Sequence, residues 1–149
     1  MDPLDQANRA IIEELQRDGR RSYSAIANAV GLSEAAVRQR VQRLREAGVI
    51  QIVAVTDPKQ VGFSRQAMVG IRAEGDLGEV AQKLSAVPEV DYVVICAGGF
   101  DILVELVCAD DRHLLEVLNS SIRTLPGVRD ADTFVYLELT AQTYTWGTR

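Results

Sequence analysis

Long apolar runs are missing from this sequence. No stretch approaches the roughly 18 consecutive apolar residues of a membrane-spanning helix, and no charged-then-apolar leader opens the chain. We therefore expect a soluble, cytoplasmic protein with no membrane partner and no export signal.

Cysteine and histidine are also scarce. The chain has two cysteines, Cys96 and Cys108, and one histidine, His113. The cysteines lack metal-ligand spacing. If a hairpin turns at residues 98–101, Cys96 faces about position 103, so we expect no disulfide. His113 falls among charged residues early in a predicted helix, which favours a solvated surface position.

No pattern of catalytic residues is present. Ser120 and Ser121 have no base near them in the sequence, and no cysteine is paired with a histidine. No glycine-rich phosphate loop follows a predicted strand. We therefore expect no catalytic residue, no metal ion and no cofactor, and a protein that is not an enzyme.

The net negative charge comes from one part of the chain. The formal net charge is −5, but residues 1–50 hold eight Arg against seven Asp or Glu. Residues 51–149 hold eight Lys or Arg against fourteen Asp or Glu. This asymmetry predicts two modules with different partners. We expect an N-terminal domain over residues 1–50, an extended linker over 51–65 and a second domain over 66–149.

Residues 33–48 predict an amphipathic helix. Ser33 is a suitable N-cap, and Gly48 suits the left-handed residue that ends a helix. Val37, Val41 and Leu44 recur at i, i+4 and i+7, which is the spacing of one buried stripe.

The opposite face of this helix suits the DNA major groove, because small and amide side chains are flanked there by arginines. The alternative is a plain solvated surface. Arg40 and Arg45 fall nearer the buried side. We expect base contacts from Arg38, Gln39 and Gln42 and a phosphate contact from Arg43. The candidate DNA-binding residues are Ser33, Ala35, Arg38, Gln39, Gln42 and Arg43.

A second predicted helix strengthens the DNA-binding interpretation. Ser24 is the expected cap of a helix over residues 25–30, which Gly31 ends just before Ser33. Two helices joined by a turn of about three residues are typical of the helix-turn-helix motif. With a first helix capped by Asp5, three helices over about 45 residues bury little surface, so we expect this module to lean on another element.

The second half alternates between strand and helix patterns. Residues 49–65 are predicted to form a strand and a connector, and the order after them is β-α-β-β-α-β, an α+β fold. Apolar residues on both faces of the strands indicate a symmetric dimer that buries the free sheet face. The predicted strands are 67–73, 90–97, 102–109 and 128–139, and the predicted helices are 76–87 and 110–125.

Together these features resemble the Lrp/AsnC (feast/famine) family of transcription regulators over nearly the whole chain. The resemblance implies an N-terminal (winged) helix-turn-helix domain joined to a ferredoxin-like βαββαβ ligand-binding and oligomerisation domain. The residues that carry it are Leu4-Asp5 with Arg9, Asp18-Gly19-Arg20, Val30-Gly31-Leu32-Ser33, Val37, Arg40, Val41, Leu44, Gly48-Val49-Ile50, Gly62, Gly98 with Phe100-Asp101, and Leu125-Pro126-Gly127-Val128.

The resemblance also implies the partners. They are double-stranded DNA, an amino acid or related metabolite as effector, and further copies that build homodimers and then tetramers or octamers. The effector residues that it implies are Gly98, Gly99, Phe100, Asp101, Thr133, Val135 and Tyr136. Glycine amides suit a carboxylate and Asp101 suits an ammonium group, although the same turn also fits a plain hairpin.

Two other functions stay open at this point. One is an architectural DNA-compacting protein with little sequence preference. The other is a ferredoxin-like metabolic enzyme or enzyme-regulating subunit. Discrete half-sites would exclude the first, and salt-sensitive DNA binding would argue against the second.

The C-terminal residues 142–149 contain Tyr144 and Trp146. An aromatic tail of this kind either packs on a neighbouring element or subunit or stays a loose end. The sequence leaves both possibilities open.

Overall fold

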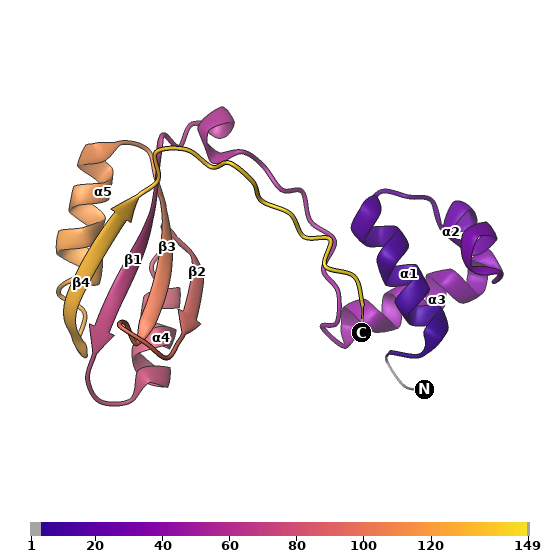
Figure 1. Ribbon diagram of the computed structural model, residues 1–149, viewed down its shortest axis with the longest axis horizontal. Coiled ribbons are helices and arrows are strands. Elements are labelled where there is room, and N and C mark those ends of the chain that lie inside the picture. Colours follow the sequence, from indigo (N-terminus) through magenta and orange to yellow (C-terminus); the bar gives the residue numbers. More distant parts are fainter. Residues whose placement is uncertain (1–3, 149) are drawn as a thin grey trace. The chain divides into compact units, whose positions relative to one another are not determined.

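The computed structural model describes residues 4–148 and divides into two compact units (Figure 1). The first unit contains the N-terminal segment through Val55 together with the C-terminal segment from Thr140, and the second runs from Thr56 to Leu139. The chain therefore passes between the units twice. None of the helices within residues 4–148 is long and apolar enough to cross a membrane.

The first unit is a three-helix module with a cap at each helix start. The backbone N–H of Asn8 donates to Asp5 Oδ1 at 2.7 Å, and that of Ala36 donates to Ser33 Oγ at 3.2 Å. Both predicted caps are therefore confirmed. The helices are α1 (Gln6–Arg17), α2 (Tyr23–Val30) and α3 (Glu34–Glu46).

Helix α2 begins earlier than the sequence predicted. Ser22, and not Ser24, is its N-cap and accepts from the N–H of Ala25 at 3.2 Å. Both serines can cap a helix, but starting at Tyr23 places the aromatic ring against the three-helix core. Packing of that ring decides between the two caps.

The predicted stripe of α3 forms the centre of the first unit's core. Val37 and Val41 are fully buried and Leu44 is 2% exposed. Ile11 and Ile26 pack into the same cluster from α1 and α2. Ile50, just after α3, also packs against this core, so the first residues of the linker give the small module added apolar cover.

The predicted strand in the linker is wrong. Residues 51–57 have no regular secondary structure, and only a short 3₁₀ helix, Pro58–Val61, follows. Val53 and Val55 are 69% and 63% exposed. A β-branched run forms a strand only when another strand pairs with its backbone, and no such partner exists within residues 4–148. For the same reason this segment forms no wing.

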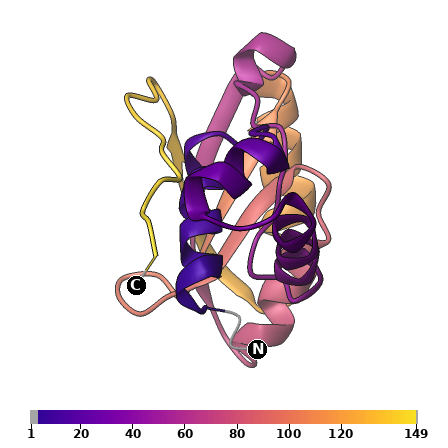
Figure 2. The same cartoon turned by 90° about the vertical axis from the view of Figure 1, so that its right-hand side faces the viewer.

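The second unit is a four-stranded antiparallel sheet in the order β2-β3-β1-β4, with both helices on one face (Figure 1; Figure 2). This arrangement confirms the ferredoxin-like β-α-β-β-α-β fold. The elements are β1 (Arg65–Ala73), α4 (Leu77–Ser85), β2 (Val90–Ile95), β3 (Ile102–Cys108), α5 (Asp111–Val117) with a π-helical turn at Leu118–Ile122, and β4 (Val128–Val135).

The last strand and the last α-helix end several residues earlier than predicted, each for a local reason. The last strand stops at Val135 because the N–H of Tyr136 makes the final bond to β1, donating to Gln66 O at 2.9 Å. The α-helical part of the last helix stops at Val117, where the backbone widens into the π turn.

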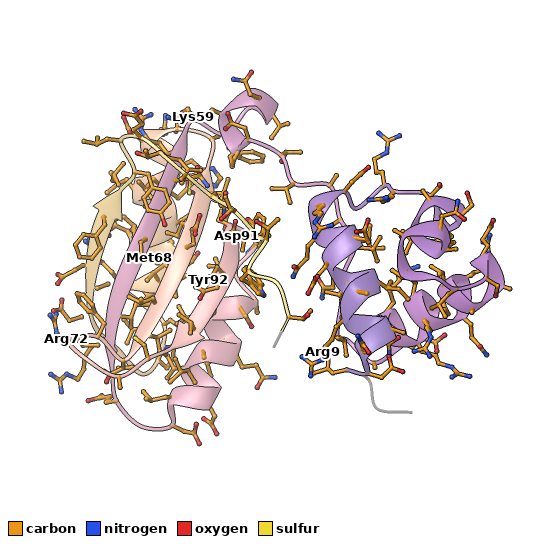
Figure 3. The ribbon with its side chains drawn as sticks, turned by 45° about the vertical axis from the view of Figure 1, so that its right-hand side comes forward. Arg9, Lys59, Met68, Arg72, Asp91 and Tyr92 are labelled. Atoms are coloured by element: carbon orange, nitrogen blue, oxygen red, sulfur yellow. The ribbon has the colours of Figure 1, made fainter. Side chains whose placement is uncertain are left out.

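The two faces of the sheet differ. Fully buried residues of β1 and β3, among them Val69 and Val104, pack against the helices. The opposite face carries Met68, Arg72 and Tyr92 (Figure 3) and is uncovered within this unit, with Tyr92 51% exposed. The residues Ala67, Val69, Ile71, Val80, Leu84, Ile102, Val104, Leu106, Cys108, Leu114, Val117, Leu118 and Ile122 make up the core.

Two details of the β2–β3 hairpin and of α5 correct the sequence analysis. Ile95 pairs with Ile102, which places Cys96 opposite Asp101 and not near position 103; both cysteines are free. His113 is not merely solvated, because its Nε2 lies 3.0 Å from Glu89 Oε1 and its Nδ1 accepts from the N–H of Ala109 at 3.2 Å.

Candidate DNA-binding and effector-binding sites

The outward face of α3 gathers the predicted base-reading residues. Ala35, Arg38, Gln39 and Gln42 are exposed and line one shared hollow together with Ala36. They lie there because the Val37 stripe fixes the opposite side of the helix in the core. Arg43 is exposed beside them, and Ser33 caps the start of the helix.

Arg38 is held by two neighbours when DNA is absent. Its Nη2 donates to Glu34 Oε1 at 2.9 Å, and its guanidinium lies 5.1 Å from the ring centre of Tyr23. Exposed ion pairs of this kind contribute only about 0–1 kcal/mol. A phosphate or base can therefore replace Glu34 at small cost, while Tyr23 continues to orient the arginine. Tyr23 was not among the predicted site residues, because α2 begins two residues earlier than its sequence pattern predicted.

Arg40 has a structural role, because it links two helices. Its Nη1 donates to Asp5 Oδ2 at 2.7 Å and to Asn8 Oδ1 at 2.9 Å, which ties α3 to the start of α1. These bonds to Arg40 lower the pKa of the Asp5 carboxyl. Arg21 is similarly occupied, because it pairs with Glu14 of α1. These arginines are thus separated from those of the outward face.

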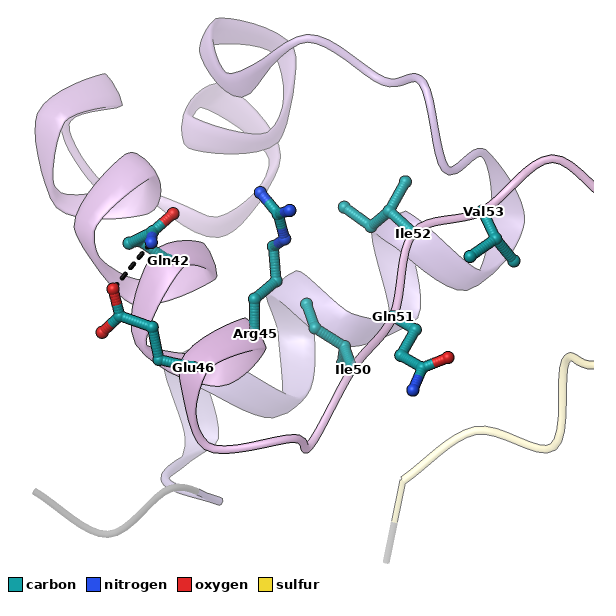
Figure 4. A pocket seen from close by; sticks show the side chains of 7 residues that line it. All are labelled: Gln42, Arg45, Glu46, Ile50, Gln51, Ile52 and Val53. Atoms are coloured by element: carbon teal, nitrogen blue, oxygen red, sulfur yellow. Dashed lines mark hydrogen bonds between the residues drawn. The ribbon is translucent and has the colours of Figure 1, made fainter. Parts of the chain in front are cut away.

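A second hollow, of about 390 Å³, lies beside the C-terminal turn of α3 (Figure 4). Gln42 lines both hollows, so the surface continues from Arg38 past Gln42 to Arg45, at i, i+4 and i+7. Arg45 is exposed, although its position on the helical wheel had suggested the buried side. The spacing of these three residues was the sequence signal for it. The lining residues are Gln42, Arg45, Glu46, Ile50, Gln51, Ile52 and Val53.

In the predicted effector turn, the two glycines have free space beside them, whereas the aromatic residue is packed against the sheet. A Cβ added at Gly98 or Gly99 would meet no atom within 4 Å. The Phe100 ring lies directly on β1, where a Cβ at Gly70 would come within 2.7 Å of ring atoms. The guanidinium of Arg72 lies 4.7 Å from the centre of that ring. Only glycine at position 70 leaves room for this stack.

Asp101 fastens the turn to the end of β1. Its Oδ2 accepts from the N–H of Ala73 at 2.8 Å, and its own N–H donates to Ile71 O at 2.9 Å. One carboxylate oxygen therefore has a structural task before any ligand arrives.

The predicted residues on β4 do not all lie near this turn. Thr133 and Val135 are opposite Val69 and Ala67, which places them on the helix-covered face. Phe134, which was not predicted, is on the uncovered face and meets Phe100 edge to face, with ring centres 6.1 Å apart. Tyr136 lies beyond the far end of β4, and the hydroxyl of Thr133 is buried without a hydrogen-bond partner in the described chain.

An acidic cluster lies toward the other end of the sheet, away from the β2–β3 turn. Gln66 Nε2 donates to Glu105 Oε1 at 3.3 Å, and Tyr136 is hydrogen-bonded to Glu105. Burial raises the pKa of Asp91, and burial together with the nearby Asp91 charge raises the pKa of Glu105. Burial and the Glu105 charge raise the pKa of Tyr136 to about 12, so the phenol stays neutral. The uncovered face therefore places two carboxyls with raised pKa values close together.

These features define a two-domain transcription regulator that binds DNA with a helix-turn-helix. Residues 4–45 match the AsnC-type helix-turn-helix domain, and residues 63–149 match the AsnC-type C-terminal dimeric alpha+beta barrel domain. The chain belongs to the Lrp/AsnC family of transcription regulators, as its sequence pattern had indicated.

Relatives that match nearly the whole chain agree with this assignment. The chain is 32% identical over 143 residues to the transcriptional regulator FL11 of Pyrococcus horikoshii, covering 95% of this chain and 94% of that protein. The leucine response regulatory protein LrpA of Mycobacterium tuberculosis is 31% identical, with a TM-score of 0.84 over 93% of this chain and 96% of that one. AsnC of E. coli is 25% identical, with a TM-score of 0.80 over 95% and 97%.

Proposed function

We propose that this protein reads double-stranded operator DNA through α3 and changes its assembly or DNA affinity when an amino acid or related metabolite binds. The observation that carries the proposal is the outward face of α3, where Arg38, Gln39 and Gln42 surround a hollow while the other side of the helix is buried. Side chains of these types bond bidentately to guanine and adenine edges.

The residues of this face have different roles in the proposal. Ala35 and Ser33 allow the start of the helix to approach the bases and the backbone closely. Arg38, Gln39 and Gln42 contact bases, and Arg43 contacts phosphate. Arg45, which continues the row of Arg38 and Gln42, extends the phosphate contacts toward the end of the helix.

The β2–β3 turn is the proposed entrance of the effector site. No other atom lies within 4 Å of the side-chain positions of Gly98 and Gly99, so a carboxylate has room to approach the backbone of this turn. The name of the leucine-responsive relative supports an amino acid as the ligand class. The ligand is to be identified by a thermal-shift screen with the twenty amino acids and their keto acids, because a selective ligand raises the melting temperature by mass action.

Substituting Asp101 in two ways separates its charge from its structural bond. Asp101→Asn keeps an oxygen for the Ala73 N–H but removes the negative charge. We expect it to weaken binding of the ligand found in the screen by about tenfold or more, with little change in melting temperature. Asp101→Ala, which also removes the acceptor for the Ala73 N–H, should lower both the ligand affinity and the melting temperature. Calorimetry that finds wild-type affinity in Asp101→Asn would assign the carboxylate to the turn alone.

The uncovered face of the second unit is the proposed homodimer interface. Tyr92 and Phe134 are 51% and 52% exposed there, and the matched family domain is dimeric. A second copy buries both faces by two-fold symmetry. We propose that tetramers or octamers then form from these dimers, in the cytoplasm, without enzymatic activity.

Self-association is expected to strengthen as the pH falls. A second copy buries Asp91 and Glu105 further, which raises both pKa values above those in the single subunit, so the dimer binds more protons. Linkage then lowers the dimer dissociation constant as the pH falls toward the raised pKa values of these two carboxyls. Sedimentation velocity at several pH values measures this dissociation constant.

The neighbours of the two carboxyls define the control for this pH test. Gln66 and Tyr136 face Glu105 as neutral groups, while Arg72 already pairs with Asp130. Glu105→Gln should therefore flatten the pH dependence. Glu79→Gln on α4 should leave it intact, and an unchanged slope in Glu105→Gln would assign the effect to other groups.

A further inference from the structure

The end of the chain returns to the first unit. Residues from Thr140 onward group with the three helices, although they follow β4 of the second unit directly. Between β4 and this end, residues 137–146 are exposed and have no regular secondary structure. The tail is therefore a second covalent connection between the units, in addition to the linker after α3.

The tip of the tail is bonded to the last turns of α1. The N–H of Gly147 donates to Gln16 Oε1 at 3.1 Å, and Thr148 Oγ1 donates to Glu13 Oε1 at 2.9 Å. Glu13 and Gln16 are three residues apart and so share one face of the helix. Gly147 and Thr148 are half-buried, in contrast to the ten residues before them.

The aromatic residues of the tail do not make this attachment. Tyr144 and Trp146 meet edge to face with ring centres 6.4 Å apart, and Trp146 remains 77% exposed. The tail is thus fastened at its tip by polar contacts.

We propose that the α1 face bearing Glu13 and Gln16 is a docking surface for the chain's own C-terminal segment, which acts as a second tether of the DNA-binding unit. The linker alone is a poor restraint, because residues 51–57 pair with no strand within residues 4–148. Fastening the tip of the tail closes a loop between the units and so reduces their freedom to reorient.

The starting point of the tether gives it a regulatory role, which rests on the proposed function. The segment begins where Tyr136 makes the last bond of β4 to β1, through Gln66 O at 2.9 Å. Ten residues separate Tyr136 from Gly147. A change at this end of β4, which is the end far from the proposed effector turn, therefore reaches α1 only through these ten residues.

The tether is tested by hydrogen exchange on the full-length protein, without DNA or effector. The double variant Gln16→Leu/Thr148→Val removes the acceptor of one bond and the donor of the other. We expect amides of residues 13–17 and of the tail to exchange about fivefold faster or more, with α4 unchanged. Trp146→Ala, which removes no bond to α1, is the matched control and should match the wild type.

Operator binding by the same variants tests the consequence. Losing a restraint on the DNA-binding unit should weaken binding by roughly threefold to tenfold. Unchanged exchange in the double variant would overturn the docking surface. Faster exchange with unchanged operator affinity would overturn the tether. Failure of the wild type to bind DNA would contradict the proposed function and leave the exchange result standing.

Discussion

Alanine in place of Gly127 is expected to destabilise the second unit by about 2–5 kcal/mol. Gly127 has φ +98°, a conformation that costs an L side chain energy. A Cβ there would lie 2.5 Å from Val80 Cγ2 and 3.3 Å from Glu74 O. Val80 is 3% exposed in the core and Glu74 O is backbone, so neither can move away cheaply. Urea unfolding of the purified protein measures the loss.

Gly99→Ala is the control for this prediction. A Cβ at position 99 would meet nothing within 4 Å, and its backbone is outside the left-handed region. We expect a change within about 0.5 kcal/mol. If Gly127→Ala were no more destabilised than Gly99→Ala, the packing of the β4 turn against α4 would be misdescribed.

Alanine at Arg38 or Gln39 is expected to cost roughly 1–3 kcal/mol of operator binding and to relax preference at particular base pairs. The reason is their exposed position on the α3 hollow, opposite the buried stripe. Stability should change little, because the contacts of Arg38 with Glu34 and Tyr23 are at the surface. Equilibrium binding to the operator and to single-base variants of it measures both effects.

Two other arginines of α3 are matched controls for that experiment. Arg43→Ala should weaken binding to all sequences alike and reduce the salt slope by about one. Arg40→Ala should lower the stability of the first unit, because it leaves Asp5 and Asn8 without their bonds from α3. Neither should alter sequence preference, and a changed preference in Arg43→Ala would revise the roles on this face.

Local pattern predicted most of the fold because buried stripes repeat with the period of their element. The i, i+4, i+7 spacing of Val37, Val41 and Leu44 predicted which side of α3 faces the core, and all three residues are buried. The order of strands and helices along the chain followed from the alternation of β and α patterns with short turns between them.

The errors came where a distant partner decides the structure. Residues 51–57 have strong strand propensity, but propensity supplies no partner for their backbone. The start of α2 depended on the packing of Tyr23, which no local rule expresses.

For the candidate sites, the sequence predicted which residues take part but not which neighbours those residues contact. The sequence placed Arg38 on the outer face but could not indicate its contact with Tyr23. The sequence indicated Phe100 but not the packing of its ring on Gly70. That contact joins a turn to a strand about thirty residues away in the chain. Asp101 looked like a free acid because its bond to the Ala73 N–H joins the start of β3 to the end of β1, 28 residues earlier in the chain.

Selection from a random duplex DNA library tests most directly whether α3 reads sequence. For the wild type we predict enriched inverted repeats whose half-sites are about one helical turn, or a whole multiple, apart. For the Arg38→Ala/Gln39→Ala variant we predict loss of that motif, with salt-sensitive DNA binding retained. Salt-sensitive binding by the wild type without any enriched motif would contradict the account and indicate an architectural protein, and no DNA binding at all would contradict it for the whole first unit.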